Sequence, residues 1–332
     1  MAAKVKVAQF GLGPIGIESV KLAAEKDWIE VVGGVDIDPA KVGKSVGDIT
    51  GDARLKNAPV YKSFEELYEK HKPQVVLHTA GSKADISIKQ IMPMAERGVS
   101  AVSSCEELLV PSFRAPELSK ELDAVCKKHD ARVLGTGVNP GFVMDVLPVC
   151  MTGVSRSVEH IYCERVVNAT TRRMPLQKKI GSGMDPGEMR RLFKEGKAGH
   201  AGFLESLALI GHAMGWKFTE TYELFEPMIA PYDIKTKFFD VKKGQCCGIH
   251  QQVVGKVGSV QRVYMDLKMY LDAQDPHDAV KITGDPPLEV RVNGGVAGDH
   301  ATVASLVNAI PRVLKAPAGV LMMTDIAVPA RA

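Results

Sequence analysis

Two adjacent carboxylates follow a short apolar run of the chain. Glu106 and Glu107 end the polar stretch 103–107, which comes directly after the apolar run 99–102. This position predicts the end of a buried strand, where a side chain can lie beside a bound ligand. In a site that closes over its ligand, a carboxylate can hold a raised pKa and move protons. It can equally cap a helix or lie in solvent, which is the ordinary role of a loop glutamate.

A glycine-rich motif near the N-terminus predicts a dinucleotide-binding loop. Residues 11–16 read Gly-Leu-Gly-Pro-Ile-Gly, after an apolar run at 5–10 and before a helical pattern. In such a loop the first glycine permits a tight turn, the second lets a pyrophosphate approach the backbone, and the third lets helix and strand pack closely. The residues expected to bind the cofactor phosphates are Gly11, Gly13, Pro14, Ile15 and Gly16.

Asp36 ends the next predicted strand, 20 residues beyond Gly16. A carboxylate at this distance accepts hydrogen bonds from the ribose hydroxyls and repels an added 2′-phosphate, so NAD is the expected cofactor. Lys41 and Lys44 follow closely and reach such a phosphate if their loop folds inward, which leaves NADP open as a second cofactor. Solvated lysines are the favoured interpretation of this pair.

Alternating short apolar runs and amphipathic segments fill the first part of the chain. Strands are predicted near 4–10, 30–36, 74–80, 99–104 and 131–136, with helices near 14–26, 63–71, 84–97 and 115–129. This pattern is typical of βαβ units and predicts a Rossmann domain, a doubly wound parallel sheet with helices on both faces. Ligands bind at the carboxyl ends of such strands, so Thr79, Ala80 and Asn139 are further expected cofactor contacts.

After Pro140 the pattern of apolar and polar residues changes to longer alternating runs, such as 232–238 and 260–267. These runs predict a largely antiparallel sheet in an α+β domain. The last helical pattern, 299–314, is expected to begin at a cap by Asp299 and to pack back on the first domain. The expected boundaries are a dinucleotide-binding domain at 1–140, a substrate and dimerisation domain at 141–298, and a C-terminal helix and tail at 299–332. A sheet of this kind is commonly buried against its twin, so a homodimer is expected.

Composition and charge exclude several classes of protein. The net charge of +3 is spread over mixed-sign stretches, which argues against nucleic acid as a partner. The chain shows neither an apolar run of about 18 residues nor a signal-peptide pattern, so no membrane contact and a cytoplasmic location are expected. The six cysteines lack a C-x-x-C pair, which predicts reduced thiols and no metal site.

Four motifs in order carry a resemblance to a known family over nearly the whole chain. They are Ser-Ser-Cys-Glu-Glu-Leu at 103–108, Gly-Thr-Gly-Val-Asn-Pro-Gly-Phe at 135–142, Gly-His-Ala-Gly-Phe-Leu-Glu-Ser-Leu at 199–207 and Val-Asn-Ala-Ile-Pro-Arg-Val at 307–313. The sequence resembles the 2,4-diaminopentanoate dehydrogenase and native amine dehydrogenase family, among the dihydrodipicolinate-reductase-like proteins. The resemblance implies reversible NAD(P)-dependent deamination of an amine to a ketone or aldehyde plus ammonia.

The resemblance also implies that one glutamate of the pair is the catalytic acid/base. Related sugar oxidoreductases carry Glu-Lys-Pro at this strand end with a catalytic lysine, and alignment on it puts Glu107 in the place of that lysine. Glu107 is therefore favoured, and Glu106 is kept. A carboxylate here can take protons from the ammonium and from the attacking water, and its charge favours a cationic iminium.

Three residues of the second half are expected to contact the substrate. Phe142 follows a Pro-Gly turn at the domain junction and is a candidate pocket wall, with core packing as the alternative. His200 lies near the start of a predicted helix, where hydrogen bonding at the helix end competes with substrate contact. Arg165 lies, like Arg172 and Arg173, on or just beyond a predicted strand. One of these arginines is a candidate partner for a substrate carboxylate, although charged residues at strand ends are usually solvated.

Two other functions stay open. A sugar or polyol oxidoreductase of the glucose–fructose type shares the two-domain plan, but the Lys-Pro that supplies its base is missing after Glu106. A non-catalytic dinucleotide-sensing regulator would keep the glycine loop and lose the proton chemistry. The sequence leaves the amine undefined, because diaminopentanoate carries a carboxylate and a second amine while alkyl amines carry neither.

Overall fold

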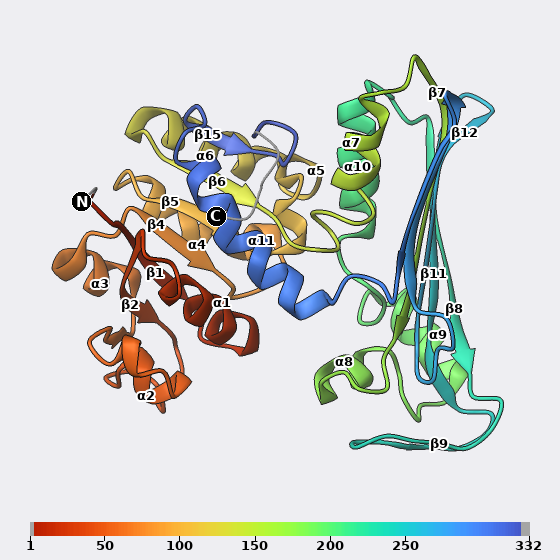
Figure 1. Ribbon diagram of the computed structural model, residues 1–332, viewed down its shortest axis with the longest axis horizontal. Coiled ribbons are helices and arrows are strands. Elements are labelled where there is room, and N and C mark those ends of the chain that lie inside the picture. Colours follow the sequence, from red (N-terminus) through yellow and green to blue (C-terminus); the bar gives the residue numbers. More distant parts are fainter. Residues whose placement is uncertain (1–2, 327–332) are drawn as a thin grey trace. The chain divides into compact units, whose positions relative to one another are not determined.

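The computed structural model describes residues 3–326, and backbone contacts divide them into two compact units. Unit 1 comprises residues up to Phe142 together with the segment from Ala297 onward, and unit 2 comprises Val143–Val296. The last residues of the predicted tail, 327–332, lie outside the described residues. The return of the chain to unit 1 after Val296 brings the C-terminal helix to the first sheet (Figure 1).

Unit 1 contains a parallel sheet whose order among the described residues is β15-β6-β5-β4-β1-β2-β3. Its strands are β1 (Val5–Phe10), β2 (Ile29–Val35), β3 (Val60–Tyr61), β4 (Val75–His78), β5 (Ser100–Ser103), β6 (Arg132–Gly135) and β15 (Gly319–Leu321). The five strands expected from the sequence are all present. The short edge strands β3 and β15 were not predicted, because two or three residues are too few to show a period.

Helices cover both faces of this sheet, as the doubly wound pattern predicted. On one face α1 (Pro14–Ala24) packs against α11 (Gly298–Val313); the other face carries α3 (Phe64–His71), α4 (Ala84–Ala95) and α6 (Pro116–His129). The short helices α2 (Val46–Thr50) and α5 (Pro111–Arg114) and the 3-10 turns η1 (Ala53–Leu55) and η2 (Glu106–Leu108) lie in the connections. Because both faces are covered, polar side chains gather at the strand ends.

The start of α11 differs from the prediction. Its N-cap is Ala297, which supplies no capping side chain, and Asp299 lies inside the first turn. The predicted cap by Asp299 is therefore wrong by two positions. A carboxylate in the first turn still interacts favourably with the N-terminal end of the helix dipole, which explains why the residue type suits either position.

Unit 2 is built on a mixed sheet with the order β14-β13-β7-β12-β11-β8 in the described chain. The strands are β7 (Ser157–Asn168), β8 (Glu220–Ile229), β11 (Cys246–Val257), β12 (Val260–Tyr270), β13 (His277–Asp285) and β14 (Leu288–Asn293). The pairing of β12 with β7 is parallel, and the other pairings are antiparallel. The largely antiparallel sheet expected from the sequence is confirmed.

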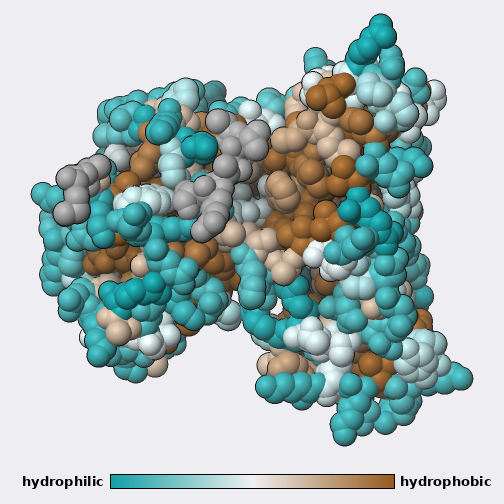
Figure 2. Space-filling model, viewed as in Figure 1, coloured by the Kyte–Doolittle hydropathy of each residue, from teal (hydrophilic) through white to brown (hydrophobic). Residues whose placement is uncertain are grey.

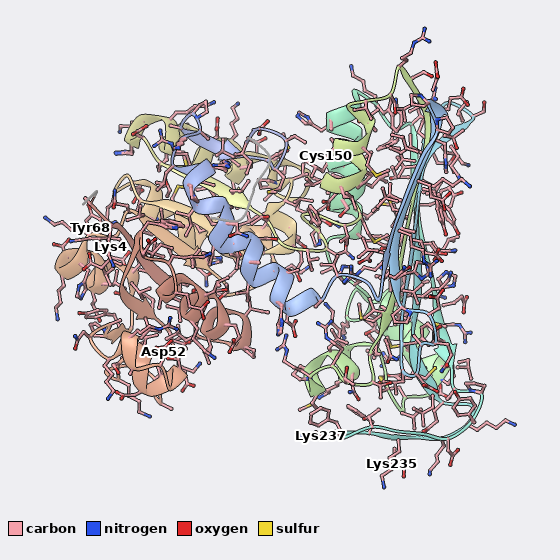
Figure 3. All side chains as sticks on the ribbon, in the orientation of Figure 1. Lys4, Asp52, Tyr68, Cys150, Lys235 and Lys237 are labelled. Atoms are coloured by element: carbon pink, nitrogen blue, oxygen red, sulfur yellow. The ribbon has the colours of Figure 1, made fainter. Side chains whose placement is uncertain are left out.

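Helices of unit 2 gather on one face of its sheet. They are α7 (Val146–Thr152), α8 (Met174–Lys179), α9 (Pro186–Lys194) and α10 (Phe203–Met214). Of these, α7 contacts β7 and β13, and α10 contacts β11. Brown, hydrophobic surface gathers in Figure 2 where Figure 1 shows α7 and α10, and Figure 3 labels the exposed Cys150 on α7.

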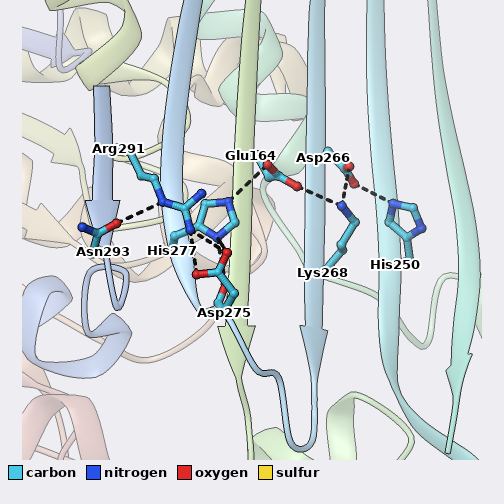
Figure 4. A network of polar contacts seen from close by, with 8 residues as sticks. All are labelled: Glu164, His250, Asp266, Lys268, Asp275, His277, Arg291 and Asn293. Carbon is cyan, nitrogen blue, oxygen red and sulfur yellow. Dashed lines mark hydrogen bonds and ion pairs between the residues drawn. The ribbon is translucent and has the colours of Figure 1, made fainter. Parts of the chain in front are cut away.

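A chain of ionic groups crosses the opposite face of this sheet (Figure 4). Lys268 of β12 lies 2.9 Å from Glu164 of β7 and 3.1 Å from Asp266, which in turn contacts His250 of β11 at 2.6 Å. On the other side Glu164 contacts His277, and the network continues through Asp275, Arg291 and Asn293. Because side chains alternate along a strand, these groups share the face that α7 and α10 leave open.

The long strand predicted at 232–238 is wrong. Only β9 (Ile234–Lys235) forms there, and it pairs with β10 (Asp240–Val241) in a small ribbon apart from the main sheet. Figure 3 shows Lys235 and Lys237 on this ribbon, pointing into solvent. The alternation of apolar and polar residues was a misleading signal here, because both faces of the segment are largely exposed and neither face packs against a core.

No helix among residues 3–326 has the length and apolarity that a membrane crossing needs.

Candidate functional site

The carboxyl ends of four neighbouring strands lie level at one edge of the unit 1 sheet. In the strand register Phe10 pairs with His78, His78 with Ser103, and Ser103 with Gly135. The loops that leave β1, β4, β5 and β6 therefore start side by side. Each loop contains residues that the sequence singled out: the glycine motif, Thr79 with Ala80, the glutamate pair, and Asn139.

The glycine motif has the geometry that a pyrophosphate requires. A side chain added at Gly16 would stand 1.9 Å from the carbonyl oxygen of Gly11, so only glycine lets α1 pack so close to the loop. Gly11 has a φ of +86°, which favours glycine. At Gly13, by contrast, an added Cβ meets nothing within 4 Å, and the helix N-terminus there has no side-chain cap. An open backbone at an uncapped helix N-terminus suits a bound phosphate.

Gln9 and Thr79 hold this loop in place through hydrogen bonds to the backbone of Gly11. The Gln9 amide nitrogen donates to the carbonyl oxygen of Gly11 at 3.0 Å and to the Thr79 hydroxyl at 2.9 Å. The Thr79 hydroxyl donates to the same carbonyl at 2.9 Å. Thr79 therefore braces the loop through Gly11, and the exposed Ala80 follows it at the surface. No sequence pattern marks Gln9 as part of the site, because its role depends on a neighbour 70 residues away.

Asp36 lies at the end of β2 with its carboxylate against the glycine loop. One oxygen accepts a hydrogen bond from the Leu12 amide at 2.8 Å, and the other accepts from the Asp38 amide at 2.9 Å. Lys41 lies 3.1 Å from the first of these oxygens. Burial raises the pKa of Asp36, but the two amides and the ammonium outweigh it, so the pKa lies below its usual value. Asp36 is thus an ionised hydrogen-bond acceptor beside the glycine loop.

Glu107 has a defined structural role. One oxygen accepts a hydrogen bond from the Ala84 amide at 2.8 Å, at the start of α4, and the other forms an ion pair with Lys83 at 2.8 Å. Its side chain is only 12% exposed. The N-cap residue of α4 is Lys83, which offers no capping oxygen, so Glu107 caps this helix from a different loop. The alternative that a glutamate of the pair caps a helix thus describes Glu107, although the helix precedes it in the chain.

Glu106 stands in a different environment although it is the next residue. It opens the turn η2 and is partly buried. Within residues 3–326 its carboxylate has no hydrogen bond or ion pair. Of the two glutamates, Glu106 is therefore the one whose carboxylate has no partner among the described residues, and its role as acid/base stays a prediction.

A buried polar chain supports the glutamate loop. The ring of His78 lies 2.9 Å from the Ser103 hydroxyl and 2.9 Å from the Gln90 side-chain oxygen. Because that oxygen only accepts, His78 carries its proton on Nε2, and its Nδ1 accepts from Ser103. The Ser103 oxygen in turn accepts from the Cys105 amide at 3.1 Å, one residue before Glu106. Burial lowers the pKa of His78 to about 4, so the ring is neutral at pH 7.

Asn139 and Phe142 follow the end of β6 and belong to unit 1. The amide nitrogen and oxygen of Asn139 are both shielded from solvent, and neither has a hydrogen-bond partner in the described chain. A shielded amide without partners suits a ligand that offers both a donor and an acceptor, as a carboxamide does. Phe142 has 41% of its surface exposed, so it is not a core side chain.

Arg165 lies in unit 2, where it is buried and forms an ion pair with Asp278. Its guanidinium donates to the Asp278 carboxylate at 2.6 Å and to the carbonyl oxygen of Val296 at 2.8 Å. Asp278 also accepts from the Val296 amide at 2.7 Å. These contacts join Val296, the last residue of unit 2, to β7 and β13, and they account for the burial of Arg165. Its proposed contact with a substrate carboxylate stays a prediction.

His200 lies in the turn before α10, as expected. Its backbone amide donates to the Gln251 side chain at 2.7 Å, and the Gln251 nitrogen donates back to the His200 carbonyl at 3.2 Å. The ring stands edge-on to Phe203, with 6.3 Å between the ring centres. The turn is therefore fixed to β11 through its backbone, and substrate contact by the ring stays a prediction.

The described residues hold no group of three or more His, Cys, Asp or Glu side chains arranged to bind a metal ion.

Comparisons with known proteins agree on one family. The model of the 2,4-diaminopentanoate dehydrogenase C-terminal domain matches residues 142–332. The chain is 31% identical to 2,4-diaminopentanoate dehydrogenase of Acetoanaerobium sticklandii, over 98% of this chain and 94% of that protein. It is 21% identical to an amine dehydrogenase of Streptomyces virginiae, over 97% and 96% of the two chains.

The fold is also that of a solved structure. The amine dehydrogenase from Mycobacterium smegmatis superposes with a TM-score of 0.87, covering 100% of this chain and 98% of that one at 21% identity. This agreement shows the two-unit fold.

Proposed function

Since this chain belongs to the 2,4-diaminopentanoate dehydrogenase family, we propose that it catalyses the reversible NAD(P)-dependent oxidative deamination of a primary amine. The products are a ketone or aldehyde and ammonia, and the reverse reaction is reductive amination. The observation that carries the proposal is the Glu106 carboxylate, without a partner in the described chain, at the same sheet edge as a loop suited to a pyrophosphate. The sugar or polyol alternative is not favoured, because both curated relatives are named for amine or diamine oxidation.

The residues of unit 1 suit a nicotinamide dinucleotide. Gly13 and the first turn of α1 offer open backbone to the pyrophosphate, Asp36 offers acceptors to the ribose, and Asn139 offers a shielded amide. When bound, the nicotinamide supplies the hydride acceptor of the reaction. An acid at the position of Asp36 favours NAD, which is the first cofactor we propose.

Glu106 is the acid/base that we propose first. The alkylammonium must lose a proton before hydride leaves its carbon, and the water that adds to the resulting iminium must lose another. A carboxylate without other partners can accept the first proton, release it to solvent, and then accept the second, and in its ionised form its charge stabilises the cationic iminium. Glu107 stays the second candidate, since its oxygens already accept from Lys83 and the start of α4. Alignment favoured Glu107, whereas the observed partners favour Glu106.

The proposal is tested by NAD⁺ reduction with a panel of amines. The panel contains 2,4-diaminopentanoate, short alkyl amines and several amino acids, and the reverse assay uses a ketone, ammonia and NADH. We expect turnover with at least one amine, and its ketone should support NADH oxidation only when ammonia is present. Turnover with polyols alone would point to the sugar oxidoreductases. Tight nucleotide binding without any turnover would point to a regulator.

A homodimer is the assembly that we propose, through the open face of the unit 2 sheet. This face carries the ionic network around Lys268, the stacked rings of Tyr162 and Tyr264, and the exposed Leu224. Burial raises the pKa of Tyr162, because its hydroxyl is already partly shielded from water in a single chain. Sedimentation at micromolar concentration should give twice the mass of 35.8 kDa, and a species of single mass would contradict the proposal. A cytoplasmic location stays a prediction.

A further inference from the structure

Lys41 lies inside the site that the sequence assigned to the cofactor ribose. Its ammonium is 3.1 Å from the Asp36 carboxylate, and its side chain is only 26% exposed. The same ammonium is 3.7 Å from Asp38. The expectation of a solvated lysine is therefore wrong for Lys41, which forms an ion pair with the residue that should decide between the two nicotinamide cofactors.

The backbone holds Lys41 in this position. The Asp38 side chain accepts from the Ala40 amide at 2.9 Å, and the Asp38 carbonyl accepts from the Lys41 amide at 2.9 Å. The loop closes when the Gly43 amide donates to the Val60 carbonyl at 2.9 Å, with Gly43 at a φ of +84°. This tight turn brings the lysine back toward the end of β2, so the ion pair is a property of the fold.

We propose that Lys41 is a specificity-determining residue that lets the site accept NADP as well as NAD. The inference rests on the proposed function, because it presupposes that the glycine loop binds a nicotinamide dinucleotide. With NAD, Asp36 accepts from the ribose hydroxyls and Lys41 remains its counter-ion. With NADP, the 2′-phosphate adds a charge of about −1.5 to −2 next to Asp36.

The negative charge of Asp36 explains why NADP binding needs a lysine beside it. An unpaired carboxylate beside a phosphate would repel it, and this is how an acid at the end of β2 normally excludes NADP. Lys41 compensates the carboxylate, and a flexible four-carbon side chain can turn from a carboxylate oxygen to a neighbouring phosphate oxygen. The ammonium then binds whichever anion the cofactor presents.

Lys44 supplies a matched control within the same loop. Its side chain is exposed, and within the described residues its ammonium has no ion pair. Its backbone carbonyl accepts from the Val60 amide, so the residue belongs to the same turn. Replacing Lys44 removes the same charge from the same loop without touching Asp36.

The test measures the dissociation constants of NADH and NADPH by calorimetry, without amine. Wild type should bind both. Lys41→Ala should weaken NADPH binding roughly 10- to 100-fold, the usual value of a charge-assisted hydrogen bond, and change NADH binding less than about threefold. Lys41→Arg should retain NADPH binding, and Lys44→Ala should resemble wild type. Lys41→Gln serves if the alanine variant does not fold.

Three results would overturn the inference while leaving the function in place. These are equal losses for NADH and NADPH in Lys41→Ala, an equal NADPH loss in Lys44→Ala, or a wild type that binds NADH without measurable NADPH. The first would make Lys41 a support of the loop, and the second would make the effect a general field of positive charge. Failure of wild type to bind either nucleotide would overturn the inference together with the proposed function.

Discussion

The two sheets of this chain carry their charged side chains in different places. In unit 1 the acids lie at the strand ends, where Asp36 follows β2 and Glu106 follows β5. In unit 2 Glu164, Asp266 and Lys268 lie in the middle of their strands and form a network across one face. A parallel sheet covered on both faces leaves only its ends for polar groups, whereas a sheet covered on one face can carry them along the strands. Charged groups at strand ends can contact a ligand bound at the loops there, whereas charged groups across an open sheet face can contact the surface of another protein chain.

The largest expected effect separates the two glutamates at the end of β5. Glu106→Gln should lower turnover by roughly 10²–10⁴, the usual contribution of a general acid/base, in both reaction directions. Glu107→Gln should instead cost about 1 kcal/mol of stability, because it weakens the cap of α4, with a smaller loss of rate. The checks are steady-state kinetics, NADH binding and thermal unfolding for each variant.

Near wild-type turnover in Glu106→Gln would contradict the assignment. If Glu107→Gln then lost its turnover while keeping its unfolding temperature, Glu107 would be the acid/base, as the alignment suggested. If both variants kept their turnover, His200 would be the next candidate to test.

The next effect distinguishes two glycines of one loop. Gly16→Ala places a methyl group 1.9 Å from the Gly11 carbonyl and should cost about 1–3 kcal/mol of stability. Gly13→Ala places its methyl group in open space, so stability should fall by less than about 1 kcal/mol, the scale of a cap change. Its NADH affinity should nevertheless fall about tenfold or more, because the methyl group occupies the approach of the pyrophosphate. Unchanged NADH binding in Gly13→Ala would place the phosphates elsewhere.

A third effect concerns pH and the buried histidine of unit 1. The pKa of His78 is about 4 in the folded chain and about 6.5 when unfolded, so between these values only the unfolded chain binds the proton. Stability should therefore fall as the pH drops from 6.5 toward 4, by up to about 1.4 kcal/mol per pH unit from this group. Urea unfolding of wild type and His78→Gln at several pH values measures the difference. Parallel pH profiles for the two proteins would mean that His78 is not buried as a neutral ring.

The smallest effect concerns the unit 2 network. Burial raises the pKa of Asp266, but His250 and Lys268 outweigh it, so the folded pKa lies below 3.8. Its stabilising contribution is present above pH 3.8 and disappears as the pH falls through the folded pKa. Asp266→Asn should therefore lose about 1 kcal/mol at pH 7, the usual value of one hydrogen bond, and approach wild type in stronger acid. A loss that persists unchanged in acid strong enough to protonate the folded carboxylate would mean that packing, and not charge, accounts for it.

Elements with a strong local period could be read from the sequence. The five main strands of unit 1, its amphipathic helices and the glycine loop were predicted because each shows its pattern within about ten residues. The ribbon at 234–241 and the start of α11 were not, since their form depends on what the rest of the fold covers or leaves exposed.

The sequence by itself determined the kinds of chemistry available at the sheet edge, because the glycine spacing, Asp36 and the glutamate pair are local facts of the chain. Only the tertiary structure decided which of these groups are bound by other segments of the chain and which have no partner among the described residues. Lys83 and the start of α4 engage Glu107 and leave Glu106 without a partner in the described chain, and a tight turn places Lys41 against Asp36. Hydrogen bonds and ion pairs between distant segments depend on distances of a few ångströms, and no periodic pattern records such distances.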